Sequence, residues 1–67
     1  MNMYKVNFSI VNQNNIKRSM ELNIGWEGKD VPSNKDVEFF LERDYLKPHE
    51  ILFKRLDIEK IEFLEKI

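Results

Sequence analysis

The feature that most constrains this chain is the stretch from Val31 to Leu46, which has the pattern of one amphipathic helix. Its apolar residues recur at helical spacing and so share one face: Val37, Phe40, Leu41 and Tyr45. Ser33 is placed to cap the first turn, and the helix is expected to end at Lys47, because a residue before proline is pushed out of the helical region. Such a face must be covered, so we expect the rest of the chain to form a layer against it.

Two stretches before this helix alternate apolar and polar residues, which is the period of a half-buried strand. The apolar residues of both stretches fall at even positions, Tyr4, Val6, Phe8 and Ile10 in 3–11, and Met20, Leu22, Ile24 and Trp26 in 16–26. Directly opposed residues share a face, so this parity excludes a two-residue turn and favours a three-residue loop at 13–15. We therefore expect Phe8 opposite Met20, with Asn15 in the left-handed conformation.

The chain after the helix has two interpretations. His49–Arg55 fits either a short helical turn after Pro48 or the start of a strand. From Leu56 the apolar residues alternate, then change parity between Ile58 and Ile61, which in a strand requires a β-bulge near Glu59-Lys60. A C-terminal helix is the alternative, because apolar residues recur at every third position among strong helix formers. That spacing drifts around a helix, so we favour the strand.

The predicted fold class is α+β: a three-stranded antiparallel sheet (β-β-α-β, order 2-1-3) with one helix packed on one face, forming a single domain over 1–67. The strand order follows because a right-handed crossover from the second strand through the helix places the third strand beside the first. Polar residues on the opposite face are expected to meet solvent, namely Lys5, Asn7, Ser9, Glu21 and Asn23.

Length and charge exclude several classes of protein. A chain of 67 residues buries only about 60% of its unfolded surface, and without cysteine no disulfide can stabilise it. Small chains of this kind often gain stability by associating with themselves or with another protein, so we consider both a second copy and a different protein as binding partners. The net charge of −1 lacks the basic excess typical of DNA-binding proteins, and no apolar run is long enough to span a bilayer. No secretory signal is present either, so we expect a cytoplasmic protein without a membrane partner.

Composition also bears on origin. The chain contains neither alanine nor threonine, whereas asparagine, isoleucine, lysine and phenylalanine are abundant. This bias is typical of AT-rich genomes, so a low-GC bacterium, its phage or a mobile element is the expected source.

Few residues could carry chemistry. His49 has no partner whose position the sequence fixes, so we interpret it as a solvent-exposed loop histidine rather than a general base. The acidic row Glu59, Glu62 and Glu65 is interrupted by Lys60, which favours a charged strand edge over a cation site. We therefore predict no catalytic residue, no metal ligand and no cofactor, and we do not expect an enzyme.

The leading hypothesis is a non-catalytic protein-binding module, such as an inhibitor or accessory factor. Phe39 and Leu46 fall on the side of the helical wheel opposite Val37, which a single sheet layer leaves uncovered. These two residues and Arg43 are the predicted partner-binding residues. Binding is expected to use either this side of the helix or the sheet edges, by strand addition, and a homodimer through the same surfaces is a further expectation.

The alternative hypothesis is a nucleic-acid-binding module that uses the tip of the predicted hairpin. Lys17 and Arg18 follow the asparagine-rich turn, and Lys5 lies on the strand before it. Basic side chains at such a tip could contact phosphates. The evenly balanced charge of the chain makes this footprint weak.

Overall fold

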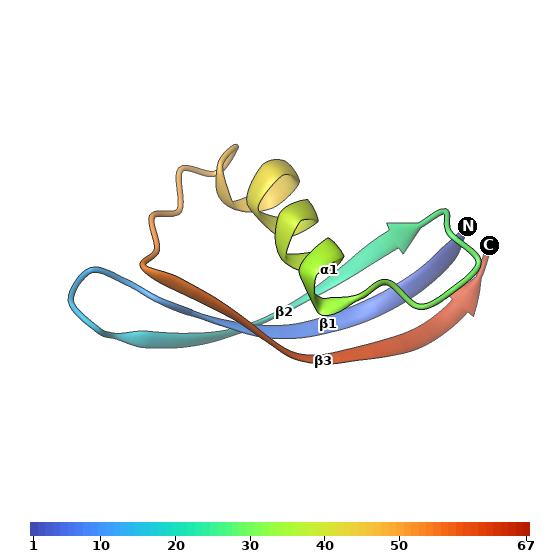
Figure 1. Cartoon of the computed structure of the whole chain (residues 1–67), viewed down its shortest axis with the longest axis horizontal. Coiled ribbons are helices and arrows are strands. Elements are labelled where there is room, and N and C mark those ends of the chain that lie inside the picture. The colour runs from blue at the N-terminus through green and yellow to red at the C-terminus, as the bar shows by residue number, and fades with distance from the viewer.

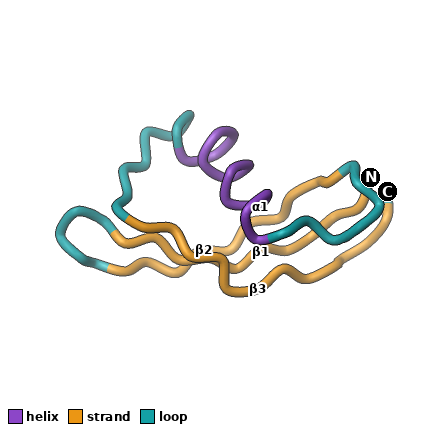
Figure 2. The backbone as a smooth tube through the Cα atoms, in the orientation of Figure 1, coloured by secondary structure: helices purple, strands orange, loops and turns teal.

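Two long strands, one helical segment and a third strand make up the chain in a computed structural model that describes residues 1–67 (Figure 1). The elements are β1 (Asn2–Val11), β2 (Lys17–Trp26), α1 (Asn34–Leu41), the π-helical turn η1 (Glu42–Leu46) and β3 (Arg55–Lys66). The strands form one antiparallel sheet in the order β2-β1-β3, which confirms the predicted α+β fold and strand order. The helical segment lies over one face of this single long layer, and the two chain ends meet at one end of it (Figure 2).

The β1–β2 hairpin has the register that the parity of its apolar residues predicts. Phe8 lies opposite Met20, and the main-chain amide of Asn12 donates to Ile16 O at 3.1 Å, which closes the three-residue loop. Asn15 has φ of 62°, the left-handed value expected of it. The side chain of Asn12 stabilises the turn further, because its Oδ1 accepts from the amides of Asn14 and Ile16.

The C-terminal segment is the predicted strand rather than a helix. β3 pairs with β1 along its whole length, and the pairing shifts by one residue where Glu59 is inserted, which confirms the predicted bulge. The bulge returns Ile61 to the face that carries Ile58, so the apolar residues on both sides of the bulge meet β1. A second shift inserts Leu64, which the sequence pattern does not predict.

The helix has its predicted N-cap residue, but its first helical residue lies later in the chain than predicted. Ser33 Oγ accepts a hydrogen bond from the amide of Asp36 at 3.1 Å, so Ser33 is the N-cap and the first helical residue is Asn34 rather than Val31. Val37 and Leu41 are buried on the predicted face.

After Leu41 the helix widens into the π-helical turn η1. The amide of Lys47 donates to Glu42 O at 3.0 Å, five residues back, where an α-helix would bond four residues back. This spacing places Leu46 one turn directly beyond Leu41, and Leu46 is 0% exposed. The prediction that Leu46 lies on the uncovered side of the helix is therefore wrong, because that prediction assumed α-helical spacing throughout.

Glu50 ends the helical segment in an uncommon conformation. Its φ is 55°, and the amides of Glu50 and Ile51 donate to Lys47 O and Leu46 O. This is the Schellman arrangement, in which glycine usually occupies the position of Glu50. The helical-turn interpretation of His49–Arg55 thus holds only up to Glu50, and the strand begins at Arg55.

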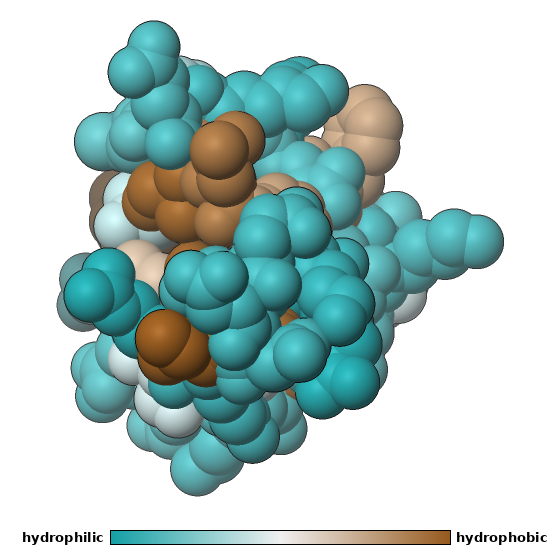
Figure 3. Space-filling view, turned by 90° about the vertical axis from the view of Figure 1, so that its left-hand side faces the viewer, coloured by the Kyte–Doolittle hydropathy of each residue, from teal (hydrophilic) through white to brown (hydrophobic).

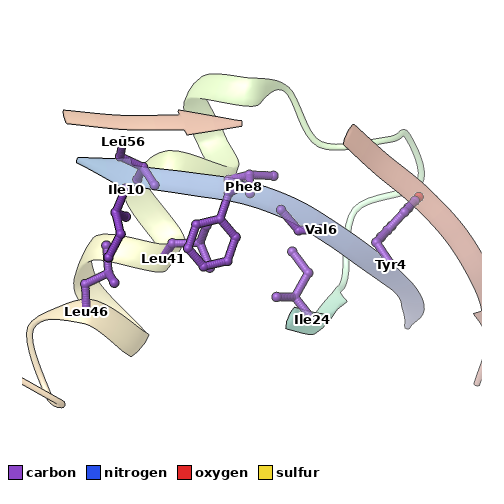
Figure 4. Close-up of a cluster of buried hydrophobic side chains, with 9 residues drawn as sticks. Tyr4, Val6, Phe8, Ile10, Ile24, Leu41, Leu46 and Leu56 are labelled. Carbon is purple, nitrogen blue, oxygen red and sulfur yellow. The ribbon is translucent and has the colours of Figure 1, made fainter. Parts of the chain in front are cut away.

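The hydrophobic core lies between the helical segment and β1. Side chains from both sides point into this space in Figure 4, and the buried set is Tyr4, Val6, Phe8, Ile10, Ile24, Val37, Leu41, Leu46 and Leu56. Four of these nine residues belong to β1, which makes the central strand the main source of buried apolar surface.

The opposite face of the sheet is less exposed than predicted. Ser9 was expected to meet solvent but is 0% exposed, because it lies on the central strand between Ser19 of β2 and Asp57 of β3. Ser9 Oγ and Asn7 Oδ1 are buried without a hydrogen-bond partner within the protein. The middle of this face is therefore covered by its own side chains.

Leu46 and Leu52 offer a matched test of the π-helical turn. Leu46→Ala should lower the free energy of unfolding by about 2–5 kcal/mol, because it leaves a cavity in the core. Leu52 is 80% exposed, so Leu52→Ala should change stability by no more than about 0.5 kcal/mol. Urea unfolding followed by circular dichroism measures both. Equal, small losses would mean that Leu46 is not buried and that the wider turn is absent.

Glu50→Gly should stabilise the protein. The left-handed conformation at φ of 55° strains any residue with a side chain, and glycine adopts it freely. We expect a gain of up to about 1 kcal/mol in the free energy of unfolding, with Glu50→Ala giving no comparable gain. If Glu50→Ala stabilised as much as Glu50→Gly, the effect would come from the removed charge and not from the backbone.

Candidate protein-binding surface

Phe39 projects from the side of α1 that faces away from the sheet. Its side chain is 63% exposed, whereas Val37 and Leu41 on the opposite side of α1 are buried. Arg43 lies four residues later, one turn along the helix, and its Cζ is 5.4 Å from the centre of the Phe39 ring. The guanidinium therefore covers part of the ring in a cation–π contact while both groups stay accessible to a partner.

Asp44 holds the Arg43 guanidinium in place through two hydrogen bonds. Arg43 Nε donates to Oδ1 and Nη2 donates to Oδ2, both at 2.9 Å. These hydrogen bonds from Arg43, together with its charge, lower the pKa of the Asp44 carboxyl, and the same pairing raises the pKa of Arg43. We call Phe39, Arg43 and Asp44 the Phe39 patch, an aromatic ring bordered by an exposed ion pair.

The structure brings together two of the three predicted partner-binding residues. Phe39 and Arg43 are in contact and exposed. Leu46 is excluded because it is buried beneath the helix. The four-residue spacing of Phe39 and Arg43 was a signal in the sequence that these two side chains would meet.

The three basic residues of the nucleic-acid alternative do not form one patch. Lys5 Nζ lies 3.5 Å from Glu21, and Lys17 Nζ lies 3.7 Å from Glu59. Arg18 pairs with Ile10 and so extends from the face that carries the helix, opposite to the face of Lys17. Lys5 is also six positions from Val11, the partner of Lys17, which is about 20 Å along the strand.

His49 packs beside the end of the helical segment. Its Nδ1 lies 2.7 Å from Tyr45 O, and its ring lies 4.8 Å from the Tyr45 ring, centre to centre. A carbonyl oxygen only accepts, so Nδ1 is the protonated nitrogen in this hydrogen bond. The imidazole is thus a second donor to a carbonyl that already accepts from the His49 amide at 3.2 Å. No group of three or more metal-ligating side chains includes it or occurs elsewhere.

A second exposed apolar area lies at the hairpin end of the molecule. Figure 3 shows that end, where hydrophobic side chains gather within a hydrophilic surround. Ile16, at the hairpin turn, is 60% exposed, and Leu52 is the most exposed large apolar residue of the chain. A shallow hollow beside Leu52 is lined by Leu46, Ile51 and the polar Lys47 and Glu50. Neither Ile16 nor Leu52 was among the residues predicted from the sequence to bind a partner.

Comparison with known proteins adds no functional information. No protein-family model, curated protein or solved structure matches this chain. No helix in the structure has the length and apolar character that crossing a membrane requires.

Arg43→Gln tests the pairing within the Phe39 patch. Removing the cation and its two hydrogen bonds should raise the pKa of the Asp44 carboxyl towards its usual value. In the wild type the pair should therefore persist at neutral pH and be lost as the pH falls through the lowered pKa of Asp44. A carbon-13 NMR titration of the carboxyl group measures this pKa. Lys47→Gln serves as the control, and an Asp44 pKa that is the same in all three proteins would contradict the pairing.

Proposed function

We propose that this chain is a non-catalytic protein-binding module, acting as an inhibitor or accessory factor, and that the Phe39 patch is its contact surface. The observation that supports the proposal is the exposed Phe39 ring with Arg43 held against it. Aromatic residues and arginine are enriched where protein interfaces gain most of their energy. A solvated aromatic ring on a folded helix is ready to be buried by a partner.

The scaffold beneath the patch supports this proposal. The other side of α1 is anchored by Val37 and Leu41, so Phe39 is presented from a fixed helix and not from a loop. Asp44 restricts the rotamers of Arg43, and a side chain that is already ordered loses less entropy on binding. Both features lower the free-energy cost of forming an interface.

Charge distribution favours a protein partner over a nucleic acid. Lys5 and Lys17, two of the three basic residues of the alternative, lie beside carboxylates of Glu21 and Glu59. A phosphate backbone would have to compete with these carboxylates for the same cations. The Phe39 patch combines an apolar ring with a balanced ion pair, which suits an interface that depends little on salt.

The proposal predicts that Phe39→Glu abolishes partner binding without unfolding the chain. A central aromatic contact typically contributes 2 kcal/mol or more, so affinity should fall by about thirtyfold or more. Affinity-tagged wild type, Phe39→Glu and Leu52→Glu are each incubated with lysate of the source organism treated with nuclease, and the retained proteins are quantified by mass spectrometry. Leu52→Glu is the control, because it places the same charge at another exposed apolar position.

The supporting result is a protein retained by the wild type and by Leu52→Glu, at low and high salt, and lost with Phe39→Glu. Circular dichroism must show that Phe39→Glu is folded, as its exposure predicts. Retention that is lost with Leu52→Glu and kept with Phe39→Glu, or that is lost at high salt, would contradict the proposal.

A further inference from the structure

The two edges of the sheet differ in how they are protected against pairing with another strand. β3 carries seven charged residues among its twelve, and its two bulges at Glu59 and Leu64 interrupt the regular backbone. Charges and bulges are the features by which natural proteins block an exposed edge. The outer edge of β3 is therefore a poor surface for strand addition.

β2 presents the opposite kind of edge. Its ten residues pair with β1 without a single shift in register, and only Lys17, Arg18 and Glu21 are charged. Because Asn12 and Ile16 form a hydrogen-bonded pair, the even-numbered residues of β2 bond to β1. The amides and carbonyls of the odd-numbered residues consequently point outward along a regular, unbonded edge: Lys17, Ser19, Glu21, Asn23 and Gly25.

Three of the four apolar side chains of β2 are also incompletely covered. α1 lies closer to β3 than to β2, and its Phe40 ring reaches the Trp26 ring at 6.3 Å between centres. Met20, Leu22 and Trp26 are only half-buried although they share a face with the core. The loop that follows β2 leaves the edge free, because Glu27, Gly28 and Lys29 lie against Met1 and Lys66 at the end of the sheet (Figure 1). An occupant that added a strand at β2 would also extend this apolar face.

We propose that the occupant is a second copy of this chain, bound by antiparallel pairing of β2 with β2 about a two-fold axis. The result is a six-stranded sheet in the order β3-β1-β2-β2-β1-β3. The helices of both copies lie on the same face, each displaced towards its own β3 and away from the two-fold axis. A two-fold contact closes on itself, so the assembly stops at the dimer.

The distribution of charges favours the register in which Leu22 meets its own copy. Arg18 then lies opposite Trp26 of the second copy, twice over by symmetry. Arg18 makes no ion pair within the chain, so its guanidinium is available for a cation–π contact with that ring. Lys17 lies beyond the paired residues and keeps its contact with Glu59.

Neighbouring registers are less favourable. A shift that centres the axis on Glu21 places that carboxylate against its own copy, and one centred on Asn23 leaves the first three residues of β2 without a partner strand. Like charges directly opposed across strands are destabilising. Centring on Met20 leaves the last three residues of β2 without a partner strand. The Leu22 register pairs nine of the ten residues of β2 and opposes no like charges.

Cysteine cross-linking tests this register directly, because the natural chain has no cysteine. Leu22 would form a non-hydrogen-bonded pair with its copy, where Cβ atoms lie about 4.5–5.5 Å apart, near the range of a disulfide. Leu22→Cys should therefore form a covalent dimer under mild oxidation. Met20→Cys is the matched control: its two copies would lie four positions apart, about 13 Å, and should not cross-link.

A second experiment removes one outward amide. Asn23→Pro deletes a hydrogen bond to the second copy but none to β1, and Leu22 before it is already extended. Sedimentation equilibrium should show a dimer for the wild type and for Asn23→Ala, with a dissociation constant raised at least about tenfold for Asn23→Pro. Phe39→Glu should remain dimeric, which separates this proposal from the function assigned to the Phe39 patch.

The proposal is overturned if the wild type remains a monomer at millimolar concentration. It is equally overturned if a dimer forms but Leu22→Cys does not cross-link, or if Met20→Cys cross-links instead. Should Asn23→Pro unfold, the cross-linking pair and the wild-type sedimentation decide the matter without it.

Discussion

The fold depends on the packing of three helical side chains, Val37, Leu41 and Leu46, against the inner face of β1. A three-stranded sheet of this length has little stability without a covering layer, and a helix of one α-helical and one π-helical section is too short to persist alone. Each therefore needs the other. β1 is central in two senses: its even-numbered side chains meet the helix, and its backbone is bonded to a strand on each side.

This arrangement determines which surfaces remain for binding. One helix on one layer leaves the outer side of α1 in solvent, and that side carries the Phe39 ring. It also leaves two sheet edges, and the uneven placement of charges and bulges makes β2 the open one. The far face of the sheet is bridged instead by ion pairs. Lys5 pairs with Glu21 between the neighbouring strands β1 and β2, and Lys17 of β2 pairs with Glu59 of β3 across the central strand. The Phe39 patch and the β2 edge are separate, so one chain could bind its copy and another protein at once.

Residue parity and local caps allowed most of the fold to be predicted from the sequence. The alternation of Phe8 and Met20 on even positions determined the register, and the parity change after Ile58 located the bulge at Glu59. The π-helical turn was missed because its five-residue hydrogen bonds follow from tertiary packing and leave no pattern in composition, and this is why Leu46 was misplaced. The burial of Ser9 was missed for a related reason: it depends on neighbours from two other strands. In the candidate site, helical spacing was enough to predict the exposure of Phe39. The two hydrogen bonds between Arg43 and Asp44 could be seen only in the structure.

Amide hydrogen exchange along β1, followed by NMR, tests the central position of this strand most directly. In the hairpin, even-numbered amides such as those of Val6 and Phe8 bond to β2, and odd-numbered amides such as those of Lys5 and Ser9 face β3. Both sets should exchange slowly and with similar protection, because both neighbours are in place. Fast exchange confined to the odd-numbered amides would show that β3 is not paired with β1, and would contradict the account.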